Sequence, residues 1–412
     1  MQTNLSPDAQ SLPRASEAEA ILRSCVHCGF CNATCPTYQI LGNELDGPRG
    51  RIYLIKQMLE GQDVSDKTQT HLDRCLSCRN CETSCPSGVK YHTLLDIGRA
   101  ELERRIDRPF AERALRAGLR YVIPRRKVFS TLLAAGRSVR PLMPEAIRQK
   151  IPSEIVHSGP RPAPRHARRV LMLEGCVQPS LSPNTNVAAA RVLDRLGISV
   201  MASDNAGCCG ATDYHLSAHE AGLNRARHNI DTWWPALEQG AEAIVIAASG
   251  CGAFVKEYGD LLAQDRNYAE KARTVSHAAK DLSEVIGSEP LERLQQVEPK
   301  RIAFHCPCTL QHAQKLNGSV ESILEKLGFE LAPVVDPHLC CGSAGTYSFT
   351  QPELAKKLRD NKLDSLEAGK PSEIVTANIG CQVHLNGARR TPVRHWIELV
   401  EEALAMTTGV GP

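Results

Sequence analysis

The C-terminal part of the chain carries the same hydrophobic pattern twice. Apolar residues recur at the spacing i, i+3, i+4 and i+7 in two stretches, and a glycine follows each stretch. This spacing is typical of the buried face of a helix, and the glycine is typical of its end. The two stripes are Ala189, Val192, Leu193 and Leu196, closed by Gly197, and Val320, Ile323, Leu324 and Leu327, closed by Gly328.

Short β-type runs precede and follow each of these predicted helices. Because strands alternate with helices, the pattern predicts two α/β repeats built on parallel layers. In such layers, ligands bind beyond the carboxyl ends of the strands. The runs are 169–173, 198–201 and 243–248 in the first repeat, and 301–304, 329–335 and 374–377 in the second.

Upstream of the repeats the sequence looks helical over residues 51–61 and 101–120, and the second of these stretches is rich in arginine. A series of prolines then predicts a semi-rigid connector. Its arginines are expected to be solvated, with contact to acidic lipid or a partner as the alternative. The prolines are Pro141, Pro144, Pro152, Pro160, Pro162 and Pro164.

Composition narrows the class of protein. The chain has 412 residues, a formal net charge of +3 and 4% aromatic residues, so it offers little for binding nucleic acid. Its start lacks the basic and apolar run of a secretory signal, and no stretch approaches eighteen apolar residues. We therefore expect a cytoplasmic protein. In a reducing compartment, its 17 cysteines are first interpreted as metal ligands or catalysts rather than disulfides.

Eight of these cysteines form two Cys-x-x-Cys-x-x-Cys-x-x-x-Cys-Pro runs. Three thiolates at this spacing wrap a 4Fe-4S cluster, while the fourth, before proline, serves the other cluster of a two-cluster ferredoxin. Zinc is the alternative, but it has no use for a third cysteine repeated twice with the same proline. The crossed rule predicts one cluster on Cys25, Cys28, Cys31 and Cys85, and another on Cys75, Cys78, Cys81 and Cys35.

Two residues inside the first run are expected to serve its cluster without binding iron. Gly29 is expected to let the backbone approach sulfur closely. His27 is expected at the edge of the cluster, because the sulfurs already complete the ligand set.

The two repeats carry a second kind of cysteine pattern. In each, thirty-one residues separate one cysteine from a Cys-Cys-Gly that follows it, and another cysteine follows the third β-type run. These cysteines are candidate ligands for a further cluster in each repeat, while buried cysteines that pack as small hydrophobes are the alternative. Cys306 remains as an extra thiol. The two sets are Cys176, Cys208, Cys209 and Cys251, and Cys308, Cys340, Cys341 and Cys381.

The fold expected from these patterns is an α+β multidomain protein. An N-terminal α-helical two-cluster 4Fe-4S ferredoxin domain should occupy residues 15–100, with a helical and proline-rich linker over 101–166. Two α/β cysteine-rich repeats should follow, over 167–290 and 298–405.

Local strings also resemble a known family, the iron-sulfur subunits of bacterial glycolate oxidase, from about Ile21 to Leu404. More distant resemblance includes subunits of anaerobic glycerol-3-phosphate dehydrogenase, lactate-utilisation proteins and heterodisulfide reductase. The strings are CVHCGFCNATCPTYQ from Cys25, ELDGPRGRIYLIKQ from Glu44, ASGCGAFVKEYG from Ala248, FHCPCTLQHAQKLNG from Phe304 and HLCCGSAGTY from His338.

The resemblance implies an electron-transfer subunit without catalytic residues of its own. Flavin-containing partner subunits would oxidise glycolate to glyoxylate, and this chain would pass electrons to an acceptor such as a membrane quinone, at the cytoplasmic face of the inner membrane. The sequence agrees, since it has no Gly-x-Gly-x-x-Gly after a strand and no Walker-type loop. Electron-transfer subunits of lactate or glycerol-3-phosphate dehydrogenases are the nearest alternatives.

One departure from the heterodisulfide reductase pattern weighs against a catalytic role for the repeats. That pattern ends each repeat in Cys-x-x-Cys, whereas Phe254 and His384 stand at the last position here. The five-cysteine clusters of that family are therefore not expected. His384 is expected to be an ordinary polar residue, with a substitute ligand as the alternative. A catalytic subunit and a zinc-stapled scaffold remain as rival functions.

Overall fold

The computed structural model describes residues 1–144, 148, 159–203, 205–294 and 300–407, and for 405–407 it describes the backbone alone. The connector residue Pro152 lies outside the described residues. The chain forms two compact units, Met1–Ala117 with His338–Leu358, and Gly118–Pro337 with Arg359–Pro412. A segment of the second repeat therefore belongs to the same unit as the N-terminal helices.

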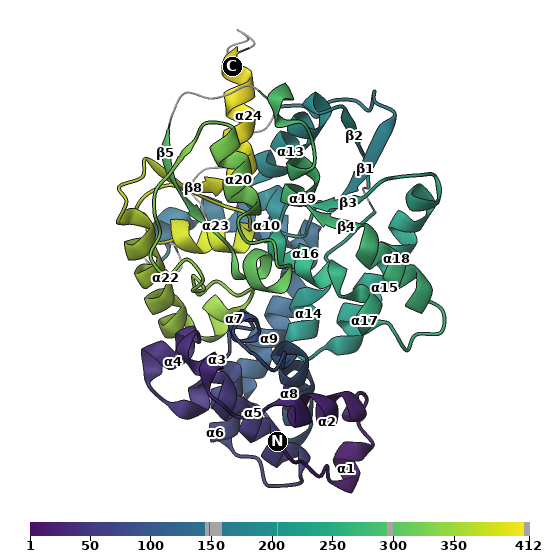
Figure 1. The fold of residues 1–412 in the computed structure, drawn as a ribbon, viewed down its shortest axis with the longest axis vertical. Coiled ribbons are helices and arrows are strands. Elements are labelled where there is room, and N and C mark those ends of the chain that lie inside the picture. The colour runs from purple at the N-terminus through teal and green to yellow at the C-terminus, as the bar shows by residue number, and fades with distance from the viewer. Residues whose placement is uncertain (145–147, 149–158, 204, 295–299, 408–412) are drawn as a thin grey trace. The chain divides into compact units, whose positions relative to one another are not determined.

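Short helices build the first unit, and none of its described residues lies in a strand (Figure 1). Pro36 and Pro48 begin two of the helices, at the position where a missing N–H costs nothing. Leu22, Ile55 and Leu94 are completely buried in its core. The helices are α1 Pro7–Gln10, α2 Ala15–Ser24, α3 Phe30–Ala33, α4 Pro36–Leu41, α5 Pro48–Leu59, α6 Asp66–Asp73, α7 Asn80–Thr83, α8 Tyr91–Arg105 and α21 Tyr347–Thr350.

The helix predicted over residues 51–61 is confirmed as α5. The stretch 101–120 is not one helix, because α8 ends at Arg105 and α9 spans Phe110–Val122. Pro109 lies between the two helices, and a proline disfavours helical backbone at the residue before it. The arginine-rich pattern predicted the helices but not the break between them.

Each repeat contributes one four-stranded parallel sheet to the second unit. The strand orders are β2-β1-β3-β4 and β6-β5-β7-β8, so both sheets have the same topology and the two repeats match strand for strand. The strands are β1 Arg168–Met172, β2 Ile198–Met201, β3 Ile244–Ile246, β4 Ala279–Asp281, β5 Arg301–His305, β6 Glu330–Leu331, β7 Glu373–Thr376 and β8 Val393–His395.

All six predicted β-type runs contain a strand, and the parallel arrangement is confirmed. The run 329–335 was predicted too long, because β6 ends before Pro333, which has no N–H to donate to a neighbouring strand. The sequence pattern missed β4 and β8. Each has only three residues and includes at least one charged residue, which is too short for a β signal.

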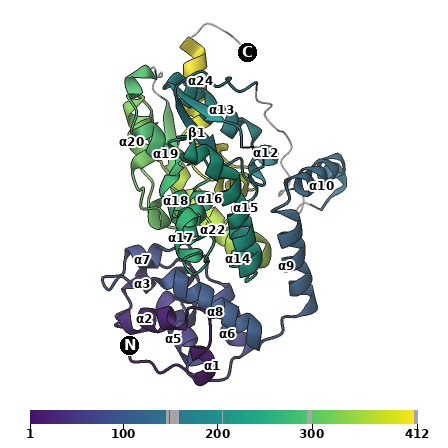
Figure 2. The same cartoon turned by 90° about the vertical axis from the view of Figure 1, so that its right-hand side faces the viewer.

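The two predicted amphipathic helices are confirmed as α13 Pro183–Arg195 and α20 Ser319–Lys326. Helix α13 packs against α24 Trp396–Thr407, and both figures show the two side by side (Figure 2). Arg191 Nη1 pairs with a carboxylate oxygen of Glu401 at 2.7 Å across this contact. Trp396 is completely buried in a core shared by both repeats.

The remaining helices cover the sheets or connect the units along the chain. None of the helices in the described ranges combines the length and apolar composition needed to cross a membrane. These helices are α10 Arg126–Ser138, α12 Gln178–Leu181, α14 Ala211–His215, α15 His219–Glu238, α16 Ser249–Lys256, α17 Tyr258–Leu261, α18 Ala269–Ala278, α19 Leu282–Gly287, α22 Pro352–Glu367 and α23 Ile379–Asn386.

Gly50 offers a test of packing in the first unit. A Cβ added there would lie 2.2 Å from the backbone oxygen of Glu44, which cannot move aside as a side chain can. We expect Gly50→Ala to destabilise the first unit by roughly 1–3 kcal/mol, the usual cost of overpacking. Thermal unfolding followed by circular dichroism measures this change.

Gly118→Ala is the matched control, since it also adds a methyl group within a helix. Gly118 lies in α9 with no atom within 4 Å of the added Cβ, so alanine should be neutral or stabilising by up to about 1 kcal/mol. Equal melting temperatures for the two variants would contradict the close approach at Gly50.

Candidate functional site

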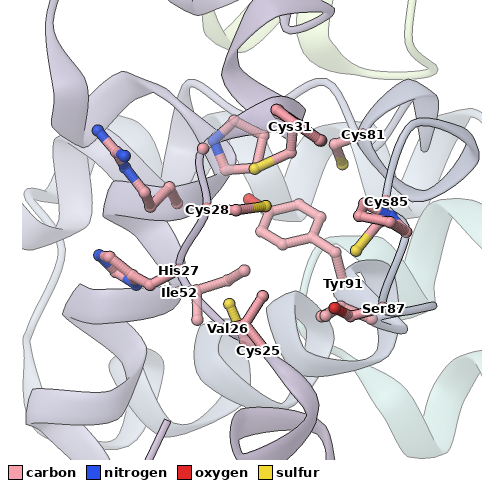
Figure 3. Close-up of a pocket in the computed structure, with 16 residues that line it drawn as sticks. Cys25, Val26, His27, Cys28, Cys31, Ile52, Cys81, Cys85, Ser87 and Tyr91 are labelled. Atoms are coloured by element: carbon pink, nitrogen blue, oxygen red, sulfur yellow. The ribbon is translucent and has the colours of Figure 1, made fainter.

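Cys25, Cys28, Cys31 and Cys85 line one hollow in the first unit. Figure 3 shows their sulfur atoms around a common space beside the ring of Tyr91. Cys25 directly follows α2, Cys28 lies in the loop before α3, Cys31 lies in α3, and Cys85 follows α7. The structure thus brings the last cysteine of the second run to the three spaced cysteines of the first.

The pKa of Cys31 depends on the other three cysteines of this set. Burial, together with the neighbouring thiols of Cys25, Cys85 and Cys28, raises the pKa of Cys31 to about 11. A raised pKa means that the free thiol does not ionise readily at neutral pH. A positively charged metal would reverse this by stabilising the thiolates.

The backbone of the first run is unusual at two residues. His27 and Gly29 have φ values of 61° and 86°, the left-handed region that favours glycine. The expectation that Gly29 lets the backbone approach sulfur stays a prediction. A Cβ at Gly29 would meet Arg49 Nη1 at 2.6 Å, so glycine makes room for this guanidinium. His27 lines the hollow, with its ring edge to face with Tyr53.

Cys35, Cys75, Cys78 and Cys81 line a second hollow of the first unit. Burial raises the pKa of Cys81 well above its usual value, and the thiols of Cys78, Cys75 and Cys35 add to the increase. Cys35 directly precedes α4, whose first residue is Pro36. The proline of each run therefore begins the segment that leads away from the crossing cysteine.

The buried guanidinium of Arg51 lies beside this second set. Only 1% of its side chain is exposed, and Nη1 lies 4.0 Å from Cys35 Sγ. Nε donates to the backbone oxygen of His71 at 2.7 Å, and Nη2 donates to the Thr37 hydroxyl at 3.1 Å. Burial opposes its charge, but the surrounding Cys75, Tyr91, Cys35 and Asp46 hold the pKa of Arg51 above its usual value.

Further donors surround the second set. The Thr37 hydroxyl lies 3.3 Å from Cys35 Sγ, and the Tyr91 hydroxyl donates to Cys75 Sγ at 3.5 Å. The backbone N–H of Ser77 also donates to Cys75 Sγ at 3.5 Å. Hydrogen bonds to ligand sulfurs and burial tune the potential of an iron-sulfur site. The second hollow therefore favours added negative charge.

The first hollow is more open to solvent. Cys28 is exposed, and the neighbouring side chains of Val26 and Phe30 are 68% and 64% exposed. Arg49 near this set already pairs with Glu44 at 2.6 Å, which neutralises much of its effect on the thiols. Both hollows thus offer cysteine sulfurs as donors, but the charged and polar groups around those sulfurs differ.

The segment His338–Leu358 brings part of the second repeat into the first unit. Asn80 Nδ2 donates to the backbone oxygen of His338 at 3.3 Å, and the Tyr347 hydroxyl donates to the backbone oxygen of Arg74 at 3.1 Å. Burial raises the pKa of Tyr347, and Cys75 and Cys340 add to the increase. Tyr347 therefore lies near sulfurs of both the second run and the Cys-Cys-Gly segment, an arrangement that the sequence did not predict.

In the first repeat, the structure brings together Cys176, Cys208, Cys209 and Cys251, as predicted. The thiols of Cys176 and Cys208 interact directly, as do those of Cys209 and Cys251. Hydrogen bonding with Cys176 and Cys209 lowers the pKa of Cys208 well below its usual value. The four sulfurs form a continuous buried group.

The glycine of the Cys-Cys-Gly motif allows the close packing expected of it. Gly210 has φ of 102°, and a Cβ there would lie 2.6 Å from the backbone oxygen of Gly222. The hydroxyl of Tyr258 donates to the oxygen of Cys209 at 2.5 Å, and Asn229 Nδ2 donates to that of Cys208 at 3.1 Å. Phe254, which stands where heterodisulfide reductase has a cysteine, packs its ring against Tyr258.

The second repeat divides its cysteines between the two units. Cys340 and Cys341 are buried in the first unit, and Cys306, Cys308 and Cys381 belong to the second. Within the second unit, donor atoms of His305 and Cys381 lie within 4.8 Å of each other. Sequence analysis missed His305, because only its burial without a hydrogen-bond partner distinguishes it from other histidines.

The chemistry of the donor sets fits iron-sulfur clusters. Five cysteines line the first hollow and four line the second, with Cys81 common to both, so together they offer eight sulfur donors, the ligand type and number of two 4Fe-4S clusters. In the first unit, Cys25, Cys28, Cys31 and Cys85 would hold one cluster, and Cys35, Cys75, Cys78 and Cys81 the other. Adjacent cysteines in the repeats can reach two irons of one cluster.

Comparison with protein families agrees with this chemistry. Residues 21–89 match the 4Fe-4S dicluster domain family. Residues 170–256 and 302–386 each match the cysteine-rich domain family. The chain is therefore an iron-sulfur protein with an N-terminal dicluster domain and two cysteine-rich repeats.

Two relatives share most of the chain, and a third shares about half of it. The chain is 66% identical over 404 residues to the glycolate oxidase iron-sulfur subunit of Escherichia coli K12, covering 98% of this chain and 99% of the relative. It is 28% identical to a probable glycolate oxidase iron-sulfur subunit of Bacillus subtilis 168, covering 89% of each chain. It is 26% identical to lactate utilization protein A of Shouchella clausii, covering 52% of this chain and 87% of the relative. The first comparison carries the assignment, and the chain belongs to the family of glycolate oxidase iron-sulfur subunits.

Proposed function

We propose that this chain is the electron-transfer subunit of a glycolate-oxidising complex, and that its two crossed sets of thiolates each ligate one 4Fe-4S cluster. The observation that carries the proposal is the meeting of Cys85 with the first run and of Cys35 with the second. When bound, such a cluster accepts and donates one electron at a time. The likeness to the Escherichia coli subunit supports glycolate as the substrate of the complex.

The oxidation of the hydroxy acid belongs to partner subunits in this proposal. Glycolate loses two electrons when it becomes glyoxylate, and a flavin can take both and release them singly. The sequence offers neither a dinucleotide-binding nor a Walker-type glycine loop, which supports a flavin on another chain. We assign a quinone as the acceptor and place the complex on the cytoplasmic face of the inner membrane.

The polar groups of the first unit support an order of reduction potentials, in which the second set has the higher potential. Arg51 and the hydroxyl of Tyr91 favour negative charge at the second set. The first set lies in more solvent-exposed surroundings. We therefore propose that electrons enter near Cys28 and are held more strongly near Cys35 and Cys75, close to Tyr347.

The first repeat supports one further cluster. Its four thiols are the expected ligands, Cys176, Cys208, Cys209 and Cys251, and they form one connected group. Four sulfur donors suit an iron-sulfur cluster. The alternative is four thiols that pack without metal.

Crossed ligation predicts matching pairs of variants. Cys85→Ser should remove the same cluster as Cys28→Ser, and Cys35→Ser the same cluster as Cys78→Ser, with a loss of about four irons each time. Electron paramagnetic resonance of the reduced protein, with iron analysis, measures this.

Cys306→Ser is the control, because this buried thiol lies outside every proposed cluster set. It should retain both spectra. A Cys85→Ser spectrum that matches Cys78→Ser instead would show that each run binds its own cluster.

The proposed order of potentials predicts the effect of removing Arg51. Arg51→Met should lower the midpoint potential of the Cys35-containing cluster by about 65–130 mV, since a hydrogen bond to a charged group is worth about 1.5–3 kcal/mol and 59 mV is a tenfold change for one electron. A redox titration followed by electron paramagnetic resonance checks this.

Arg49→Met is the matched control near the other set. Arg49 is more exposed and already paired with Glu44, so its removal should shift the potential of the Cys28-containing cluster less. An equal shift for both variants, or a rise for Arg51→Met, would contradict the assigned role of Arg51.

If partner subunits oxidise glycolate, the activity should depend on their presence. The isolated full-length chain should not reduce an artificial dye with glycolate, whereas the chain co-expressed with its flavoprotein partners should. Dye reduction by the isolated chain would overturn the proposal that the chemistry lies on partner subunits.

A further inference from the structure

Helix α10 exposes a stripe of apolar residues of the kind that a helix normally buries. Val128, Leu132, Ala135 and Val139 follow the spacing i, i+4, i+7 and i+11, which places them on one face of the helix and its C-terminal cap. Leu132 and Val139 are 51% and 46% exposed, and α10, which the structure describes in full, has no buried residue. The stripe is therefore open to solvent at the outside of the second unit, where α10 contacts α12 (Figure 2).

Further apolar side chains are exposed directly before and after α10. Leu142, in the helical turn Arg140–Leu142 that contacts α10, is 88% exposed. Tyr121, shortly before α10 in the chain, is 56% exposed, and Arg125 Cζ lies 4.4 Å from the centroid of its ring. Exposed apolar residues that gather in one place, unlike scattered ones, mark an interaction surface.

Positive charge accompanies this stripe. Residues 118–144 contain six basic residues and no acidic one, a local excess in a chain whose formal net charge is only +3. Three of the basic residues, Arg125, Arg126 and Lys127, are exposed at the start of α10. These three cations form what we call the α10 surface, together with the exposed apolar residues Tyr121, Leu132, Val139 and Leu142.

Charge distinguishes the occupants that such a surface could have. A second copy of this chain, bound through the same surface by two-fold symmetry, would bring the same cations together, and like-charge repulsion disfavours this. A protein partner would have to present an acidic patch of matching shape. An anionic bilayer complements both features, because its headgroups attract lysine and arginine and its acyl boundary accepts apolar side chains.

We propose that the α10 surface docks this chain on an anionic lipid bilayer. The apolar side chains enter the boundary between headgroups and acyl chains, and the cations contact lipid phosphates. A helix of this kind lies in the plane of the membrane surface. The proposal rests on the placement of the complex at the inner membrane proposed above, and it assigns that contact to one segment of this chain.

The test is flotation of the full chain with its iron-sulfur clusters, purified anaerobically, on lipid vesicles. One set of vesicles contains equal parts of phosphatidylcholine and phosphatidylglycerol, and the other contains phosphatidylcholine alone. The chain should bind the anionic vesicles at least about tenfold more tightly than the neutral ones, because several cations face the headgroups. High salt should weaken this binding, because it screens exposed charges.

Removing the apolar side chains tests the hydrophobic part of the contact. The double variant Leu132→Ser with Leu142→Ser should bind the anionic vesicles at least about tenfold more weakly, since each leucine loses the gain from entering the bilayer. Both side chains are exposed, so the variant should fold as the wild type does. Val335→Ser is the matched control, because Val335 is 65% exposed outside the α10 surface and its loss should leave binding unchanged.

Removing cations tests the electrostatic part. The double variant Arg126→Gln with Lys127→Gln should lose about fivefold in affinity for each cation, and its binding should depend less on salt. Lys326→Gln is the matched control, because it removes an exposed lysine in α20, outside the α10 surface. It should bind as the wild type does.

Two results would overturn the proposal. One is a wild-type chain that does not float with the anionic vesicles, including the case in which the variants lose a protein partner instead. The other is equal binding by the wild type and both double variants. Circular dichroism shows whether a variant that loses binding is still folded. The assay contains neither glycolate nor partner subunits, so its result is independent of whether the complex oxidises glycolate.

Discussion

The exchange of one sulfur between the two cysteine runs is the constraint on which the first unit depends. Cys85 joins the first run and Cys35 joins the second, so neither set of four is complete without both runs. This requires α3 and α7 to pack together, which they do, although about fifty residues separate them. Arg51 and Asp46 lie buried between the connecting helices and add an ion pair at 3.8 Å to the same region.

The cysteine sulfurs of the two sets are chemically alike, but the charged and polar groups around each set differ. The second set has a buried guanidinium and a tyrosine hydroxyl that donates to sulfur, whereas the first set has an exposed cysteine and an arginine already paired with glutamate. The repeats also differ on one fold, since Leu173 in the first corresponds to His305 in the second.

Spacing in the sequence was enough to predict the crossed sets, both amphipathic helices and the parallel sheets, because these depend on local periodicity and a known ligand rule. It did not predict that Asn80 and Arg74 hold the segment around Tyr347, because such long-range contacts leave no periodic signal. Nor could it single out His305. A buried imidazole without a partner becomes visible only when the space around it is known.

The central claim is that the eight cysteines of the first unit hold two iron-sulfur clusters close enough to interact. The most direct test is iron and sulfide analysis of the anaerobically purified full chain, combined with electron paramagnetic resonance after reduction. The account predicts two 4Fe-4S signals with mutual magnetic broadening. Zinc in these sites without iron would contradict it.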